Sequence, residues 1–364
     1  MTIYFLQSNP TLGSGGLIQA YRHVRILADA GHDARLLFLD PDDKPALAAP
    51  YAYLPVSFLR RTIAKVPVVG ERLHNRRMVA MPIVQAPSPG YPVHYVRADG
   101  IVERRALTAK DILVLPEYFG PALRATATSV PVVVFNQGPH LSFMGSDRIP
   151  AGHTIYQDPI LGVVNVSAYG ERYLLSAFPK LRTYVVPNAV DPDLFWYSPD
   201  KKKQIAFMPR KLHEDLVQVM TLLSARGSLG GWNLCPIEGV KPARAAEMLR
   251  ESAVFLSTLS QEGFGLPPLE AALCGCVVVG YTGFAAAEFM DPAFCFPVPE
   301  RDVLAFVQIL EGVLKALDAD PSSFRARNEA FAGQLRERFA PEQQRRALLA
   351  AWDDILRRHN GAAS

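Results

Sequence analysis

The stretch SQEGFGLPPLEA, residues 260–271, decides how the rest of the chain is interpreted. Glu262 and Glu270 stand eight positions apart with a Gly-x-Gly loop between them. A helix is predicted to begin near Pro268, because proline lacks the amide hydrogen that a first helical residue would leave unpaired. The backbone N–H groups of 263–269 then lie at the positive end of a helix dipole, which favours an anion such as a phosphate. Glu262 is predicted before the loop and Glu270 two or three residues into the helix, so both carboxylates can flank a ligand over that terminus.

Strands and helices alternate on both sides of this stretch. A glycine loop at 13–16 joins the first strand to a helix that ends near Gly31, a βαβ pattern typical of a parallel sheet. Residues 187–200 are rich in proline, asparagine and aspartate, which indicates a linker between two α/β domains. Short β-branched or apolar runs predict buried strands at 3–7, 34–39, 112–115, 132–135, 163–166, 204–208, 253–257 and 277–279.

Composition excludes several classes of protein. The 364 residues are 49% hydrophobic and 20% charged with a net charge of +3, which excludes disorder over most of the chain and gives no broad basic footprint for nucleic acid. No apolar run is long enough to span a membrane, and the first residues predict a strand, not a signal peptide. Four cysteines without paired ligand spacing suit core thiols in a reducing cytoplasm.

With Glu262 and Glu270, the stretch resembles the E-x7-E signature of retaining glycosyltransferases of the glycogen-synthase-like group, the family four type. That group has the glycosyltransferase-B fold, in which two Rossmann-like domains face each other across a cleft. Here the resemblance implies an acceptor-binding domain over 1–186 and a nucleotide-sugar domain over 187–340, with a helix at about 341–358 crossing back to the first. Further matches follow in the same order: Gly15-Gly16, Gly31-His32, the segment 186–191 with Phe195, Arg210-Lys211, 274–278, Gly283 and Glu288.

The resemblance implies transfer of a hexose-type unit from a nucleotide-diphosphate sugar to a glycan or lipid-linked acceptor, with retention at the anomeric carbon, in bacterial surface polysaccharide or glycoconjugate synthesis. Glu262 is expected to orient sugar hydroxyls and Glu270 to hold the ribose. No metal and no cofactor are expected, because protein donors take the diphosphate. These donors are Arg210 and Lys211, the backbone of Gly263, Phe264, Gly265 and Leu266, and the Gly15 and Gly16 loop.

The acceptor side offers neutral and ionisable candidates. Relatives often carry a histidine just after the strand that is predicted here at 132–135, and this chain has Asn136 and Gln137 there, with His140 close behind. Either a neutral amide takes that catalytic place or His140 does. Glu117, at the end of the preceding strand, is an acceptor-side carboxylate or a capping residue.

A basic stretch at 60–77 holds six cations and one acid. Pro67 and Gly70 interrupt any continuous helix there, so two short amphipathic pieces are predicted. The stretch is a solvated face, or it contacts an anionic membrane or lipid phosphate through Arg72, Arg76 and Arg77.

Two other functions stay open. A nucleotide-sugar 2-epimerase has the same fold, although more carboxylates and histidines would be expected in its N-terminal domain for proton transfer. A non-catalytic partner domain is less compatible with the presence of Glu262, Glu270, Arg210 and Lys211 together. Nucleotide, sugar, acceptor and oligomeric state are not predicted.

Overall fold

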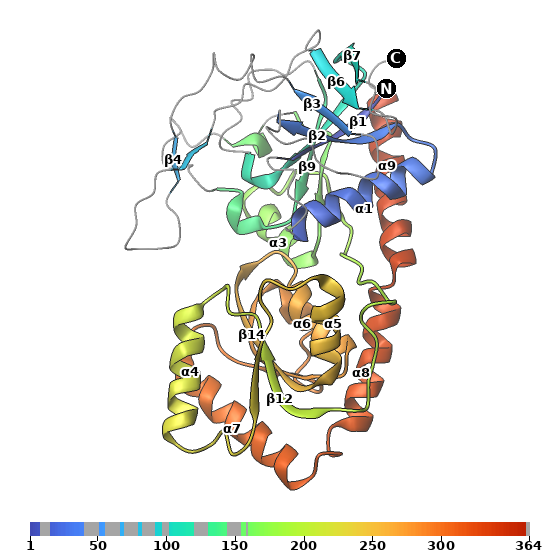
Figure 1. Cartoon of the computed structure of the whole chain (residues 1–364). Coiled ribbons are helices and arrows are strands. Elements are labelled where there is room, and N and C mark those ends of the chain that lie inside the picture. The colour runs from blue at the N-terminus through green and yellow to red at the C-terminus, as the bar shows by residue number, and fades with distance from the viewer. Residues whose placement is uncertain are drawn as a thin grey trace. The chain divides into compact units, whose positions relative to one another are not determined.

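The computed structural model describes residues 1–7, 15–39, 51–54, 66–68, 79–81, 92–96, 102–119, 130–143, 154–157 and 159–361. Contacts within the chain divide it into two compact α/β units. Unit 1 holds residues 1–166, 170–186 and 345–364, and unit 2 holds residues 167–169 and 187–344. Each unit is built around its own sheet (Figure 1).

Unit 1 contains a nine-stranded sheet in the order β11-β10-β9-β8-β1-β2-β3-β6-β7, in which β6 runs antiparallel to both neighbours and the other pairs are parallel. A separate antiparallel pair joins β4 to β5. The strands are β1 (Ile3–Gln7), β2 (Ala34–Leu39), β3 (Tyr51–Leu54), β4 (Val66–Val68), β5 (Val79–Met81), β6 (Pro92–Val96), β7 (Val102–Ala106), β8 (Ile112–Pro116), β9 (Val132–Asn136), β10 (Gly162–Asn165) and β11 (Thr183–Val185).

Helices cover both faces of this sheet. On one face, Phe5 of β1 and Phe135 of β9 pack against His23 of α1, and Phe5 also contacts Trp352 of α9. On the other face, alternate side chains of the same strands form a core with Leu174 of α3. The helical segments are α1 (Gly15–Asp29), η1 (Glu117–Phe119), η2 (Pro139–Leu141), η5 (Ile155–Gln157), α3 (Ala168–Ala177) and α9 (Pro341–Gly361).

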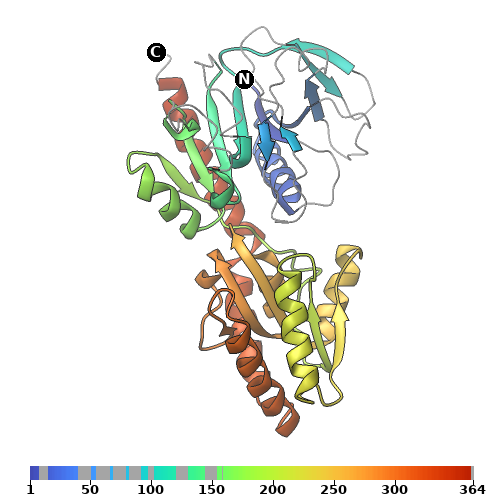
Figure 2. The ribbon, with the colours of Figure 1, turned by 90° about the vertical axis from the view of Figure 1, so that its left-hand side faces the viewer.

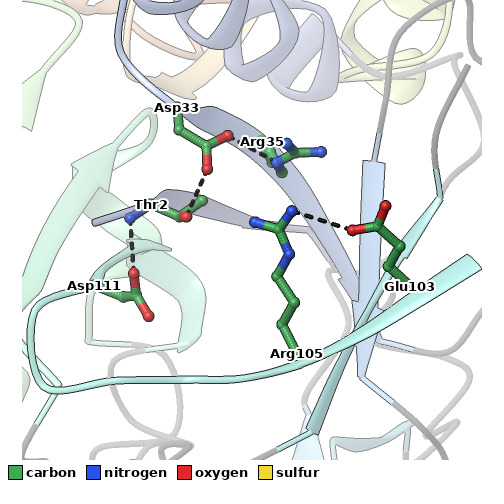
Figure 3. Close-up of polar contacts among 6 residues, drawn as sticks. All are labelled: Thr2, Asp33, Arg35, Glu103, Arg105 and Asp111. Carbon is green, nitrogen blue, oxygen red and sulfur yellow. Dashed lines mark hydrogen bonds and ion pairs between the residues drawn. The ribbon is translucent and has the colours of Figure 1, made fainter.

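The amino-terminal edge of this sheet carries a polar network that fixes the central strands (Figure 3). Asp111 accepts hydrogen bonds from the Thr2 amide at 2.7 Å and from the amide and hydroxyl of Thr108 at 2.8 and 2.9 Å. The Thr2 hydroxyl donates to Asp33 at 2.7 Å, and Arg35 pairs with the same aspartate. These carboxylates are therefore satisfied by hydrogen bonds that hold the fold together.

Unit 2 contains a parallel five-stranded sheet in the order β13-β12-β14-β15-β16. Helices α4 and α7 contact each other on one face, and α5, α6 and α8 cover the other (Figure 1). Figure 2 views this unit from the face that α4 covers. The elements are β12 (Lys202–Phe207), α4 (His213–Ala225), β13 (Asn233–Pro236), α5 (Pro242–Glu251), β14 (Ser252–Glu262), α6 (Leu266–Leu273), β15 (Val277–Phe284), η6 (Ala285–Glu288), β16 (Phe296–Pro297), α7 (Val303–Ala319) and α8 (Arg325–Arg338).

The eight strands predicted from apolar runs are all present. Most of their ends lie within one or two residues of the predicted ends. Two predictions need correction in length: β14 continues to Glu262 and β15 continues to Phe284, because both strands pair through to their carboxyl ends. The amphipathic pieces predicted within 60–77 are wrong at Val66–Val68, which forms a strand paired with Val79–Met81. The rest of that stretch lies outside the described residues.

The described cysteines are free thiols, and Cys274 and Cys276 are buried. The Cys276 thiol donates to the carbonyls of Leu249 and Ser252. They are core residues, in agreement with the sequence prediction.

Candidate functional site

The strand order of unit 2 places its ligand-binding edge. The chain leaves β12 through α4 to β13 on one side, while β14 pairs with β12 on the other side. In open parallel sheets, ligands bind beyond the carboxyl ends of the two strands where the order reverses in this way. Here these strands are β12, which is followed by Arg210 and Lys211, and β14, which ends at Glu262.

An ion pair spans this reversal point. The Lys211 Nζ donates to Glu262 Oε1, and the two side chains keep 39% and 23% of their surface exposed. Arg210, on the same loop, is exposed, and within the described parts of the chain it makes no ion pair. Arg210, Lys211 and Glu262 together bring a guanidinium, an ammonium and a carboxylate to this point, a set that can hold a phosphate beside a group with hydroxyls.

The N-terminus of α6 lies next to Glu262. Gly265 precedes the helix with φ 93°, and a Cβ there would lie 2.9 Å from Ala286 Cβ and from Leu259 Cδ1, so only glycine fits. The helix begins at Leu266, two residues before the predicted start at Pro268, and the predicted place of Glu270 near its start is corrected to the second turn. Pro267 and Pro268 have no amide hydrogen, which leaves Gly263, Phe264, Gly265 and Leu266 as the donors of this loop.

Backbone strain gathers at the same edge of unit 2. In the described residues, four that are not glycine have positive φ, and each lies near or after the carboxyl end of a strand of this sheet: Leu212, Gln261, Phe284 and Arg301. Such conformations persist where the surrounding structure over-determines them, and they cluster at functional sites. No signal in the sequence marks these positions, because leucine, glutamine, phenylalanine and arginine all favour negative φ. Two of them flank Lys211 and Glu262 directly.

Unit 1 has a corresponding edge. The chain leaves β1 through α1 to β2 on one side, and β8 pairs with β1 on the other. Gly15 and Gly16 form the N-terminus of α1, and a Cβ on Gly16 would lie 3.4 Å from the Gln137 Nε2, so the amide of Gln137 lies beside this helix terminus. Gly13 and Ser14 lie outside the described residues.

Glu117 holds the loop that carries Gln137. It directly follows β8, is 2% exposed, and its Oε2 accepts a hydrogen bond from the Gln137 amide at 3.0 Å. Burial raises the pKa of this carboxyl to about 7, although backbone donors of Gln137 and Gly138 oppose the shift. Its contacts are those of a residue that positions a loop.

The other acceptor-side candidates make contacts with neighbouring elements of unit 1. Asn136 is buried, and its Nδ2 donates to Asn165 Oδ1 on the neighbouring strand at 2.7 Å. The His140 ring packs against Tyr173 of α3 with their centroids 5.0 Å apart, on the face of the sheet that α3 covers. Of the three residues that could replace the usual histidine, Gln137 is the one beside Gly16.

Replacing Glu117 by glutamine should change how stability depends on pH. A carboxyl whose pKa rises from 4.5 to about 7 on folding binds more protons in the folded state, so wild-type stability falls as pH rises between these values. The neutral amide removes this cost. Relative to wild type, Glu117→Gln should therefore gain on the order of 3 kcal/mol between pH 5 and pH 8 in urea denaturation. Parallel stability curves for the two proteins would contradict a buried carboxyl at this position.

The last candidates concern a contact with a membrane and a metal site. Arg72, Arg76 and Arg77 lie in a segment that the structure does not describe. In the described ranges, no helix is long and apolar enough to cross a membrane. Within the same ranges, no group of three or more His, Cys, Asp or Glu side chains is placed to hold a metal ion.

Comparisons with known proteins agree with this architecture. No protein-family model matches the chain. A curated α-1,6-glucosyltransferase of Actinobacillus pleuropneumoniae serotype 7 (strain AP76) is 26% identical over 191 residues, 50% of this chain and 56% of that protein. The match thus spans little more than half the length of this relative.

Solved structures match over nearly the whole chain. The pneumococcal O-GlcNAc transferase GtfA, in complex with UDP and GlcNAc, has a TM-score of 0.56 at 12% identity, with 99% of each chain covered. TarM has a TM-score of 0.59 at 11% identity, with 98% of each chain covered. Anabaena Alr3699/HepE, in complex with UDP and glucose, has 0.57 at 12%, with 97% and 99% covered. The chain therefore has the α/β fold of these proteins, the glycosyltransferase-B fold.

Proposed function

We propose that this protein is a retaining glycosyltransferase that moves a sugar from a nucleotide-diphosphate sugar to a glycan or lipid-linked acceptor. The observation that carries the proposal is the Lys211–Glu262 pair at the strand reversal of unit 2, on a strained edge beside the N-terminus of α6. The glucosyltransferase relative and the UDP and glucose in the Alr3699/HepE structure make UDP-glucose the first donor to test. Synthesis of a bacterial surface polysaccharide or glycoconjugate is the proposed setting.

The edge of unit 2 divides the donor among its residues. Arg210 and Lys211 bind the diphosphate, with the backbone donors of the loop from Gly263 to Leu266. The leaving diphosphate carries the developing negative charge, and fixed donors aimed at it lower the barrier. Glu262 accepts hydrogen bonds from sugar hydroxyls, and Glu270 accepts them from the ribose diol.

The edge of unit 1 receives the acceptor in this proposal. The Gln137 amide beside Gly16 can donate to and accept from hydroxyl groups, and Glu117 holds its loop in place. Retention follows if the acceptor hydroxyl attacks from the face that the diphosphate leaves, with the departing phosphate taking its proton. A metal ion has no assigned role in these steps, so transfer should continue in EDTA.

The proposal is tested with purified protein, radiolabelled UDP-glucose and a panel of glycan and lipid-diphosphate acceptors. The expected result is an α-linked product that forms equally well in EDTA. A β-linked product would contradict retention, and activity that returns only with manganese or magnesium would contradict metal independence. Conversion of UDP-glucose to a 2-epimer without acceptor would favour the epimerase instead. If the protein bound no nucleotide-diphosphate sugar of any nucleotide class, the non-catalytic partner domain would be the remaining function.

Glu270→Ala should weaken UDP binding by about 1.5–3 kcal/mol, or about 10- to 150-fold, because charge-assisted hydrogen bonds to the ribose are lost. Isothermal calorimetry measures the effect. Glu251→Ala is the matched control, since Glu251 is a partly exposed glutamate paired with Lys202 at the amino-terminal edge of the same sheet. Equal affinities for UDP in all three proteins would remove Glu270 from the site.

We also propose that the basic stretch at 60–77 contacts a membrane, with the enzyme working at the cytoplasmic face. If Arg72, Arg76 and Arg77 contact anionic lipid, the protein should sediment with anionic but not neutral vesicles, since each engaged cation contributes about 1 kcal/mol. Binding should fade at 1 M salt, where the Debye length is about 3 Å. A variant with all three arginines changed to serine that still sediments would leave the stretch as a solvated face.

A further inference from the structure

Phe284 is an exposed aromatic residue held in a backbone conformation that phenylalanine avoids. It ends β15 with φ 70° and ψ −52°, close to the strained γ-turn of positive φ, and 43% of its surface is exposed. Burial of the ring thus does not compensate for the strain. Rarely populated backbone conformations of this kind cluster at ligand-binding sites, where the position of a side chain matters more than its cost.

The turn around Phe284 is fixed by its neighbours. The Phe284 amide donates to the Thr282 Oγ1 at 3.2 Å. Glu300 Oε1 accepts from the Thr282 amide at 3.1 Å, the Thr282 hydroxyl at 3.1 Å and the Gly283 amide at 2.8 Å. Three donors on one carboxylate oxygen hold the last residues of β15, so the ring is presented in one direction.

Phe284 lies directly beside the proposed donor site. In the pairing of β14 with β15, Glu262 is the register partner of Phe284, while Lys211 reaches Glu262 from the β12 side. Cation, carboxylate and aromatic ring therefore follow one another across the carboxyl edge of the sheet. Tyr169 stacks on Phe284 with ring centroids 6.0 Å apart and planes 14° apart, and the Tyr169 amide is held by Glu288 at 2.5 Å.

We infer that Phe284 is a specificity-determining residue that contacts the C–H face of the sugar carried by the donor. A pyranose has hydroxyls around its rim and an apolar face of C–H groups, so it matches a carboxylate with an aromatic ring beside it. The inference rests on the proposed function, in which Lys211 holds the diphosphate and Glu262 the sugar. Phe284 and Lys211 lie on opposite sides of Glu262. In the proposed function, Phe284 is therefore on the side of the sugar and Lys211 on the side of the diphosphate.

The test separates sugar recognition from nucleotide recognition. Binding of UDP, GDP and ADP to the wild type first identifies the preferred nucleotide. Calorimetry then compares the affinity for that nucleotide with the affinity for its glucose conjugate. Phe284→Gly should bind the free nucleotide as wild type does and bind the glucose conjugate at least fivefold more weakly. Phe284→Tyr, which keeps an aromatic ring, should bind the conjugate with the affinity of the wild type. Without ligand, Phe284→Gly should melt at the same or a higher temperature, because glycine accepts positive φ.

Trp196→Gly is the matched control, because Trp196 is also 43% exposed but stacks on Arg250 at the amino-terminal end of β14. It should change neither affinity. An unchanged affinity of Phe284→Gly for the glucose conjugate, or an equal loss for nucleotide and conjugate, would overturn the sugar contact and leave the proposed function standing. A wild type that binds none of these nucleotides or conjugates would overturn the proposed function, and the inference with it.

Discussion

Replacing Lys211 by methionine should lower kcat/KM for sugar transfer about 100- to 1,000-fold, the usual loss when one fixed donor to a developing negative charge is removed. Methionine keeps most of the apolar stem and loses the ammonium group. That group lies at the strand reversal of unit 2 and donates to Glu262. Its loss removes both the positive charge that faces the diphosphate and the partner that orients the Glu262 carboxylate. Steady-state kinetics with UDP-glucose measure the loss.

Lys202→Met is the control for this change. Lys202 begins β12 at the opposite edge of the same sheet and pairs with Glu251 at 2.9 Å, and the two side chains are 61% and 40% exposed. Exposed ion pairs contribute little to stability, so this variant should keep its activity and its fold. If Lys211→Met retained wild-type kcat/KM, the diphosphate would have to bind elsewhere, and the proposed division of the donor would be wrong.

Gly280→Ala should destabilise unit 2 by about 4 kcal/mol or more, an exceptional loss for one methyl group. Gly280 has φ 134°, and a Cβ there would lie 2.2 Å from the carbonyl oxygen of Ser257, its register partner on β14, and 2.9 Å from Phe306 Cζ. Backbone of a paired strand cannot withdraw without breaking the ladder, so β15 would have to separate from β14. Guanidinium denaturation followed by circular dichroism measures the loss.

Gly312→Ala provides the opposite outcome in the same unit. Gly312 lies inside α7 and a Cβ there meets nothing within 4 Å, so the substitution should stabilise the helix by up to about 1 kcal/mol. The two variants carry the same chemical change, and only the surroundings differ. Equal denaturation midpoints for both would mean that β14 and β15 are not spaced as described.

The elements of the fold could be predicted because their signals are local. Apolar runs of four to six residues bounded by glycine, proline or aspartate mark strands such as β1 and β9 without knowledge of their partners. The start of α6 depends on a non-local contact, so the local signal of Pro268 predicts it two residues late. Gly265 takes φ 93° against Ala286 and Leu259, and this contact sets the beginning of the helix at Leu266.

By itself, the sequence determined the residue types at the candidate edges, because Lys211, Glu262 and Gln137 each follow or end a recognisable strand. Only the tertiary structure decided which of them meet. Lys211 and Glu262 are 51 residues apart and come together because β12 and β14 are neighbours in the sheet. Strand order likewise puts Phe284 beside Glu262, and its positive φ comes from the turn that Glu300 holds. Local patterns carry no information on strand order, since pairing depends on contacts between distant segments.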